Sequence, residues 1–166
     1  MQRKDGAEPE SIPSTAAGMD TPATRELAAL FHEAFQASTG QAARWAAERI
    51  HGNVRFERAW CVPFHGHGLR GCFTLRWDEQ LQRYLGTRVG EKASRPEYLG
   101  AVLRSAAGRW CQQQGQRHGM SLRLLPSAEA APEVQGMAPT CSAALFVDAF
   151  VLELGFIVDD TTSARP

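Results

Sequence analysis

The sequence carries no excess of charge of either sign and no long apolar run. Its 18 lysine and arginine residues balance 18 aspartate and glutamate residues, so the formal net charge is zero. A chain without a basic excess offers no general attraction for nucleic acid or for an anionic membrane surface. No apolar run approaches the roughly 20 residues that span a bilayer, and the first twenty residues lack the apolar stretch of a signal peptide. We therefore expect a cytoplasmic protein that binds neither nucleic acid nor membrane.

Motifs of several common chemistries are also missing. The sequence has no glycine-rich phosphate loop of the GxGxxG or Walker type and no GxSxG nucleophile elbow. Its cysteines lie far apart and form no CxxC pair, which argues against a zinc framework and for reduced thiols. These residues are Cys61, Cys72, Cys111 and Cys141. The sequence therefore predicts neither a cofactor nor a metal.

His65 and His67, on either side of a glycine, come nearest to a metal-binding pattern. In an extended segment both imidazoles would share one face, and Cys61 or Cys72 would add a soft ligand. A zinc site needs three or four converging ligands, however. We prefer the interpretation that both histidines are exposed residues of a hairpin turn.

What the sequence does contain is the composition of an ordinary globular domain, with 43% hydrophobic and 22% charged residues among 166. Residues 1–20 are rich in Pro, Ser, Gly, Ala and charge and lack a hydrophobic period, so we expect a disordered tail there. The folded domain should span residues 21–160. Residues 161–166 should form a short C-terminal tail.

Hydrophobic spacing and turn residues predict the order of helices and strands. Thr21 and Pro22 form a favourable helix start, and residues 41–50 either continue that helix or begin a second one. Asp78 is a candidate N-cap for a further short helix. Long helices are predicted over 22–36 and 96–116. Strands are predicted over 53–64, 69–76, 121–125, 142–148 and 150–158, with a turn near Asp148 and Ala149 between the last two, and loops are predicted over 86–96 and 127–140. The fold class is therefore α/β, of the α+β kind, with two long helices packed on a largely antiparallel sheet.

The helix predicted over 96–116 contains two glycines. Its apolar residues share one face, on which we interpret Trp110 as core rather than as a binding aromatic. Gly100 and Gly108 lie inside this helix, where glycine costs roughly 1 kcal/mol relative to alanine. We interpret both as positions of close packing against the sheet or a second helix. The alternative is that an amphipathic helix merely tolerates them.

The stretch "EYLGAVLRSAAG" at 97–108 matches, without a gap, the pattern "DAxGExxNxxxG" of a long helix in a known family. Gly100 and Gly108 match its glycines, Glu97 takes its acidic position, and Pro126 falls close to its expected proline. On these residues, and on the glycine-rich hairpin before them, the sequence resembles the CheC/CheX/FliY chemotaxis phosphatases, in their single-unit, CheX-like form. The resemblance implies their fold.

The same alignment places Ala101 at the catalytic Glu position of the family and Arg104 at its catalytic Asn position. In the family, the Asn enters the partner response regulator and orients the attacking water, and the Glu pairs with a basic residue of the partner. An amide offers both a donor and an acceptor, whereas arginine offers only donors and cannot act as a base. Alanine offers neither. The resemblance thus argues against phosphatase activity, and no residue is identified as catalytic.

We therefore expect a CheX-like pseudo-phosphatase of two-component signalling that binds a response-regulator receiver domain or associates with itself, as the homodimers of the family imply. Its partner-binding face would carry Glu97, Ala101, Arg104 and Pro126. Arg104 has the chemistry to pair with a carboxylate or phosphate of the partner; alternatively it belongs to a solvated face. Two other hypotheses stay open. One is a divergent active phosphatase in which Glu97 and another polar residue, such as Ser105, take over catalysis, and the other is an unrelated α+β protein-binding module.

Overall fold

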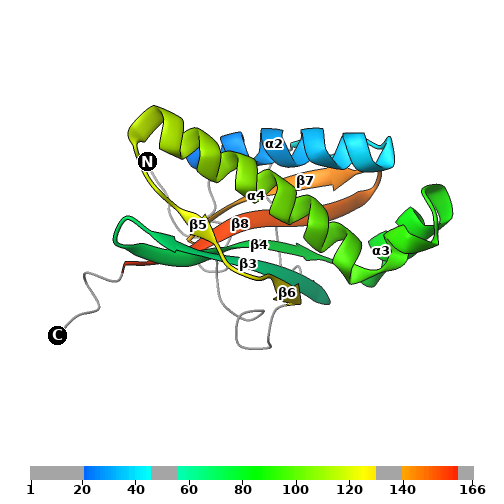
Figure 1. The fold of residues 1–166 in the computed structure, drawn as a ribbon. Helices are drawn as coiled ribbons and strands as arrows, with labels where there is room; N and C mark the ends of the chain where they lie inside the picture. The colour runs from blue at the N-terminus through cyan, green and yellow to red at the C-terminus, as the bar shows by residue number, and fades with distance from the viewer. Residues whose placement is uncertain (1–20, 46–55, 130–139, 161–166) are drawn as a thin grey trace, which may run out of the picture.

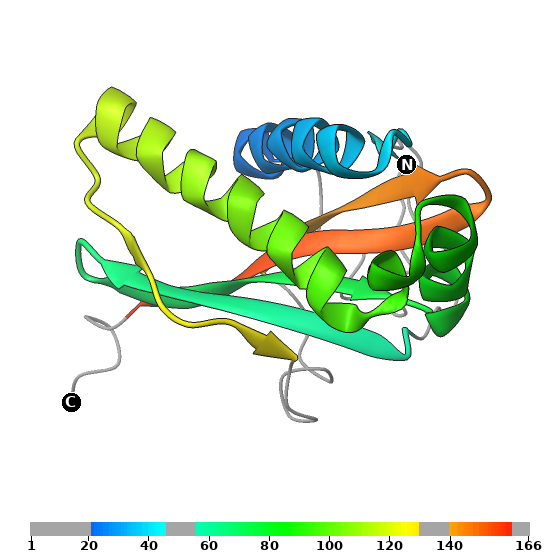
Figure 2. The same cartoon turned by 45° about the vertical axis from the view of Figure 1, so that its right-hand side comes forward.

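The structure, a computed structural model, describes residues 21–45, 56–129 and 140–160. The described strands form one seven-stranded sheet, and two long helices lie over one of its faces (Figures 1 and 2). A shorter helix lies at one end of the sheet (Figure 2). The predicted α+β class, with two long helices on a largely antiparallel sheet, is confirmed. The tails predicted at 1–20 and 161–166 lie outside the described residues.

The helices begin where the sequence predicts. They are α2 (Pro22–Thr39), α3 (Glu79–Arg88) and α4 (Pro96–His118), with a 3-10 turn, η1 (Glu91–Ser94). The hydroxyl of Thr21 accepts a hydrogen bond from the Thr24 amide at 3.2 Å and so caps α2. α2 and α4 end at Gly40 (φ 75°) and Gly119 (φ 66°), where the left-handed conformation favours glycine.

The strands pair antiparallel throughout the described sheet. They are β2 (Arg44–Trp45), β3 (Arg58–Gly66), β4 (Leu69–Trp77), β5 (Arg123–Leu124), β6 (Ala128–Glu129), β7 (Cys141–Val147) and β8 (Phe150–Asp160). Their order is β2-β7-β8-β4-β3-β5, and β6 also pairs with β3. Two hairpins, β3–β4 and β7–β8, thus make the sheet by pairing β4 with β8.

Both hairpins turn where the sequence predicts. The loop of the first consists of His67 (φ 56°) and Gly68 (φ 77°), and positive φ at both positions gives the turn the twist of its strands. Asp148 (φ 55°) begins the second turn. The β3 strand begins at Arg58, later than predicted, and residues 53–55 lie outside the described residues.

Some boundaries predicted from the sequence are wrong. Residues 41–45 are not helical, because Gly40 ends α2 and Arg44–Trp45 pair with β7 instead. The strand predicted over 121–125 shrinks to two paired residues, β5. The segment 86–96, predicted as a loop, contains the end of α3 and the 3-10 turn η1. The segment 127–140, also predicted as a loop, contains β6.

Asp78 occupies the N-cap position of α3, as predicted, but its side chain makes no capping hydrogen bond. The carboxylate of Glu57 accepts the hydrogen bond of the Glu79 amide instead, at 2.9 Å. An acidic side chain from another segment therefore satisfies this helix end.

The core lies between the two long helices and the sheet. Trp110 is 9% exposed, and its ring contacts Phe73 from β4 edge-on, with centroids 5.6 Å apart. Phe156 from β8 completes this aromatic cluster, 5.2 Å from Trp110. The interpretation of Trp110 as a core residue is therefore confirmed. Because the inner side of α4 is packed in this way, its outer side is held at a fixed orientation to the sheet.

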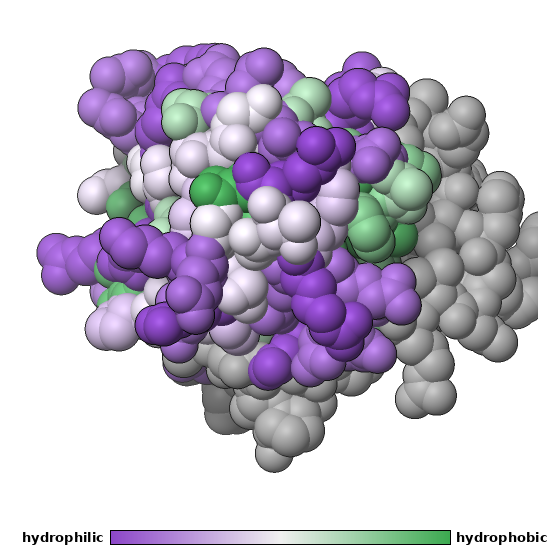
Figure 3. Space-filling view, turned by 90° about the vertical axis from the view of Figure 1, so that its right-hand side faces the viewer, coloured by the Kyte–Doolittle hydropathy of each residue, from purple (hydrophilic) through white to green (hydrophobic). Residues whose placement is uncertain are grey.

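The surface at the end that carries α3 is mainly hydrophilic, with apolar residues in small separate areas (Figure 3). Within the described residues, neither long helix has the length and apolar character required to cross a membrane. Each of the four cysteines is a free thiol.

Candidate functional site

The outer side of α4 carries three of the four residues that the sequence analysis assigned to a partner-binding face. Glu97, in the first turn, and Ala101, one turn later, are exposed, and Arg104 is half-buried. Pro126, the fourth residue, is exposed in the segment that follows β5. The helix therefore presents these positions to solvent rather than to the core.

Arg104 bridges α4 and the segment that ends in Pro126. Its Nη1 donates a hydrogen bond to the carbonyl oxygen of Leu125, with a separation of 2.7 Å and 21 residues of chain between the two. The structure therefore brings the residue at the Asn position next to the proline of the predicted pattern. The bond also shows that the guanidinium is not merely solvated, because one of its donors is already engaged within the chain.

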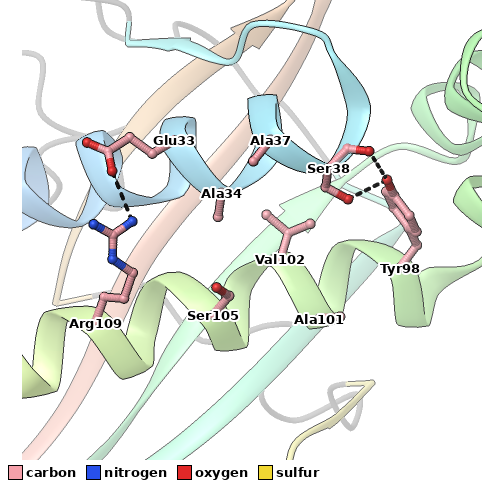
Figure 4. A pocket seen from close by; sticks show the side chains of 9 residues that line it. All are labelled: Glu33, Ala34, Ala37, Ser38, Tyr98, Ala101, Val102, Ser105 and Arg109. Atoms are coloured by element: carbon pink, nitrogen blue, oxygen red, sulfur yellow. Dashed lines mark hydrogen bonds and ion pairs between the residues drawn. The ribbon is translucent and has the colours of Figure 1, made fainter.

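Ala101 and Ser105 lie on the flank of α4 that faces α2 (Figure 4). Glu97, Ala101 and Ser105 follow one another at intervals of four residues. Eight residues of α-helix rise about 12 Å, so the backbone positions of Glu97 and Ser105 lie about two helical turns apart.

Between α2 and α4 lies a groove of about 570 Å³. We call it the α2/α4 groove. Its lining comes from both helices and consists of Glu33, Ala34, Ala37, Ser38, Tyr98, Ala101, Val102, Ser105 and Arg109 (Figure 4). Small side chains dominate this lining, which leaves the hollow between the two helices unfilled.

Polar bridges tie the two helices together at both ends of this groove. At one end, Arg109 Nη1 lies 2.9 Å from Glu33 Oε1. At the other, the Tyr98 hydroxyl donates to the backbone oxygen of Ser38 at 3.0 Å and contacts its hydroxyl. A third bridge, from Arg117 to Glu26, lies beyond the groove. The pairings show that the helices run antiparallel, and that Arg109 and Arg117 are both engaged with α2.

The two glycines of α4 have different surroundings. A Cβ atom added at Gly100 would overlap the indole of Trp60 in β3 and lie only 2.6 Å from its Nε1. A Cβ atom added at Gly108 would meet nothing closer than Leu124 Cδ1, at 3.8 Å, an ordinary van der Waals distance. Gly100 therefore permits a close approach of helix and sheet, whereas Gly108 leaves room for a methyl group.

The spacing of His65 and His67 made a metal site near the hairpin turn a candidate. His65 and His67 are both exposed, and the described part of the chain holds no group of three or more His, Cys, Asp or Glu side chains that could bind a metal ion. The thiols of Cys61 and Cys72 interact, which lowers the pKa of Cys61 and raises that of Cys72. Burial raises the pKa of Cys111 to about 11.

Sequence reasoning missed the contribution of α2 to this surface. Ala34, Ala37 and Ser38 give a weak signal, because small residues on the outer side of an amphipathic helix leave space for a neighbour. These small residues can be interpreted as the lining of a groove only when the position of the neighbouring helix is known.

A second hollow, of about 480 Å³, lies between α2 and β2, where Trp45 is 43% exposed and the Arg25 guanidinium lies 5.6 Å from its ring.

No protein-family model and no curated protein matches the sequence. Solved structures match the fold over most of its length. The chemotaxis protein CheX of Vibrio vulnificus is 9% identical, with a TM-score of 0.64 over 84% of this chain and 97% of that one. A CheC-like superfamily protein of a Shewanella species is 7% identical, with a TM-score of 0.63 over 85% and 99% of the two chains.

A third similar structure is the complex of CheX with CheY, BeF3 and Mg from Borrelia burgdorferi. This chain is 10% identical to it, with a TM-score of 0.60 over 81% of this chain and 96% of that one. Identities at this level establish the fold and nothing further. The chain has the CheC/CheX fold, as the resemblance of its sequence implies.

Proposed function

We propose that this chain binds the receiver domain of a response regulator through the outer side of α4 and does not dephosphorylate it. The Borrelia CheX that shares the fold is in complex with CheY, which supports a receiver domain as the partner. An unrelated α+β module would not be expected to share this fold over most of its length. The proposal goes beyond the fold in naming both the partner and the missing catalysis.

The observation that carries the loss of catalysis is the hydrogen bond from Arg104 to the Leu125 carbonyl. The family's amide orients water because it both donates and accepts. A guanidinium only donates, and this one is held towards the segment before Pro126. Ala101, one turn away, has no polar side-chain atom. Neither position supplies the acceptor or base that an attacking water requires.

Arg104 is nevertheless suited to binding an anion. A guanidinium has five N–H donors, and one of them is bonded to Leu125. The remaining donors would meet the phosphoryl group of an activated receiver, a contact strengthened by opposite charge. The protein would then retain the phosphorylated form of its partner instead of resetting it. Homodimerisation, which the resemblance also implies, belongs to the same proposal and is tested by light scattering in solution.

The test combines binding with turnover. Receiver domains encoded in the same genome are titrated with the protein, with and without beryllofluoride, by calorimetry, and their loss of phosphate is followed in parallel. We expect tighter binding of the beryllofluoride-treated form and no acceleration of phosphate loss. Arg104→Gln should weaken that binding, whereas Arg123→Gln, an exposed change in β5, serves as the control. Robust phosphatase activity of the wild type that survives Arg104→Ala would overturn the proposal in favour of a divergent phosphatase.

A further inference from the structure

We propose that the α2/α4 groove receives one uncharged aromatic side chain of a partner protein, with a polar atom at its tip. That this partner is a receiver domain rests on the function proposed above. The charge, the floor and the rim of the groove each support this choice of occupant.

The charge of the lining favours an uncharged occupant. Of the nine lining residues, Glu33 and Arg109 are the charged ones, and they pair with each other across one end of the groove at 2.9 Å. An ammonium or carboxylate entering the groove would lose water and find each opposite charge already engaged. A neutral side chain avoids that loss.

The floor of the groove favours an apolar body. It is formed by Ala34 and the buried Val102, and the methyl groups of the exposed Ala37 and Ala101 continue the apolar lining (Figure 4). The volume of about 570 Å³ falls in the range of about 300–1,000 Å³ that is typical of pre-formed binding sites. Burial of apolar surface is favourable roughly in proportion to its area, so a large flat side chain gains most.

The rim favours an aromatic ring with a hydrogen-bonding tip. The hydroxyl of Tyr98 is engaged with Ser38, so Tyr98 offers its ring to the groove, and aromatic pairs prefer edge-on or offset contacts. Ser105, about two turns further along α4, is exposed and makes no hydrogen bond within the described part of the chain. Its hydroxyl can satisfy a phenol or an indole N–H, which indicates tyrosine or tryptophan.

Ala101 connects this groove to the partner-binding face. The resemblance implies a Glu at this position that pairs with a basic residue of the partner. Alanine removes that carboxylate and leaves its volume to the groove. An inserted aromatic ring would then replace the ion pair as the contact at this position. A suitable partner would carry an aromatic residue at the place where the partners of the phosphatases carry the basic residue.

Indole is the probe for the groove itself. Titration of the labelled full chain with indole should move the backbone amide signals of Ala37, Ala101 and Ser105, with a dissociation constant in the millimolar range expected for so small a ligand. Ala37→Phe places a ring in the groove and should abolish these shifts. Gln36→Phe adds the same ring at the neighbouring exposed position, which does not line the groove, and should leave them unchanged. Ala101→Leu is a second, smaller blocking variant, and thermal melts verify that each variant folds.

Two outcomes overturn the inference. One is an indole titration that leaves the groove amides unmoved or that survives Ala37→Phe in a folded protein. The other is a receiver domain that binds the wild type, Ala37→Phe and Gln36→Phe equally, since loss of a buried aromatic anchor should weaken binding about 10- to 100-fold. If no receiver binds while indole occupies the groove, the proposed function fails and the groove inference stands.

Discussion

The two flanks of α4 are built in opposite ways. On the flank towards β3 and β5, a glycine admits the indole of Trp60 and an arginine closes the gap to Leu125. On the flank towards α2, small side chains such as Ala101 and Ser105 line a groove, and polar bridges lie at its two ends. One side of a helix can therefore be closely packed while the other side keeps room for a ligand. Substitutions on the first flank should therefore change stability, with Arg104 as the residue there that is also proposed to contact the partner, and substitutions on the second should change binding.

The largest effect is expected at Gly100. Gly100→Ala forces a methyl group into the Trp60 indole, and overpacking of this kind costs about 1–3 kcal/mol. The free energy of unfolding, measured by urea denaturation, should fall by that amount. An unchanged midpoint would mean that helix and strand separate without cost, and that the first flank is not tightly packed.

A smaller loss of stability is expected from Arg104→Met. This change keeps the length of the side chain but removes the donor to the Leu125 carbonyl, and a hydrogen bond of this kind contributes about 1 kcal/mol. Hydrogen exchange at the amides around β5 should accelerate, because the bond holds that segment to α4. Arg104→Lys, which retains a donor, should recover part of the protection. Equal exchange in both variants would contradict the role of the bond.

Gly108→Ala, in contrast, should stabilise the protein. The position lies in the same helix and has room for a methyl group, so the higher helix propensity of alanine should raise the free energy of unfolding by about 0.5–1 kcal/mol. Gly100→Ala, measured in the same urea titration, is the matched comparison. Destabilisation by both substitutions would show that Gly108 is packed as closely as Gly100.

The smallest effect is expected at the end of the groove. Glu33 and Arg109 are 58% and 48% exposed in their side chains, and exposed ion pairs contribute about 0–1 kcal/mol. Glu33→Gln should lower the free energy of unfolding by less than about 0.5 kcal/mol, with the difference disappearing in high salt. A large, salt-independent loss would instead make the groove flank part of the structural support of α4.

Much of the fold was predictable because it depends on local patterns. The Thr21–Pro22 start of α2, the spacing that defines α4 and the turns at His67 and Asp148 all follow from residues near one another in sequence. The β2 strand was not predictable, since two residues carry no alternation and their pairing depends on β7. Asp78 was identified as a cap, but the capping carboxylate comes from Glu57, more than twenty residues before the helix amide it accepts from.

The candidate site, like the fold, was predictable only where it depends on residues close together in the sequence. The alignment of α4 with a known pattern selected Ala101 and Arg104 as candidates, and what each lacks follows from the residues that the resemblance implies there. The bond from Arg104 to Leu125 and the groove lined by Ala37 depend on how distant segments pack. No periodicity in one helix reveals which side chains of another helix face it. The different surroundings of Gly100 and Gly108 likewise depend on the neighbouring side chains, Trp60 and Leu124.

The contact between Trp60 and Gly100 has an evolutionary consequence. A side chain at position 100 is obstructed while the indole is present, whereas a smaller residue at position 60 opens a cavity that a side chain at position 100 could refill. The order of changes therefore matters: a lineage must first accept a weakened core at position 60 before position 100 can vary. Each residue restricts the substitutions that are possible at the other, so substitutions at the two positions should occur together in related sequences.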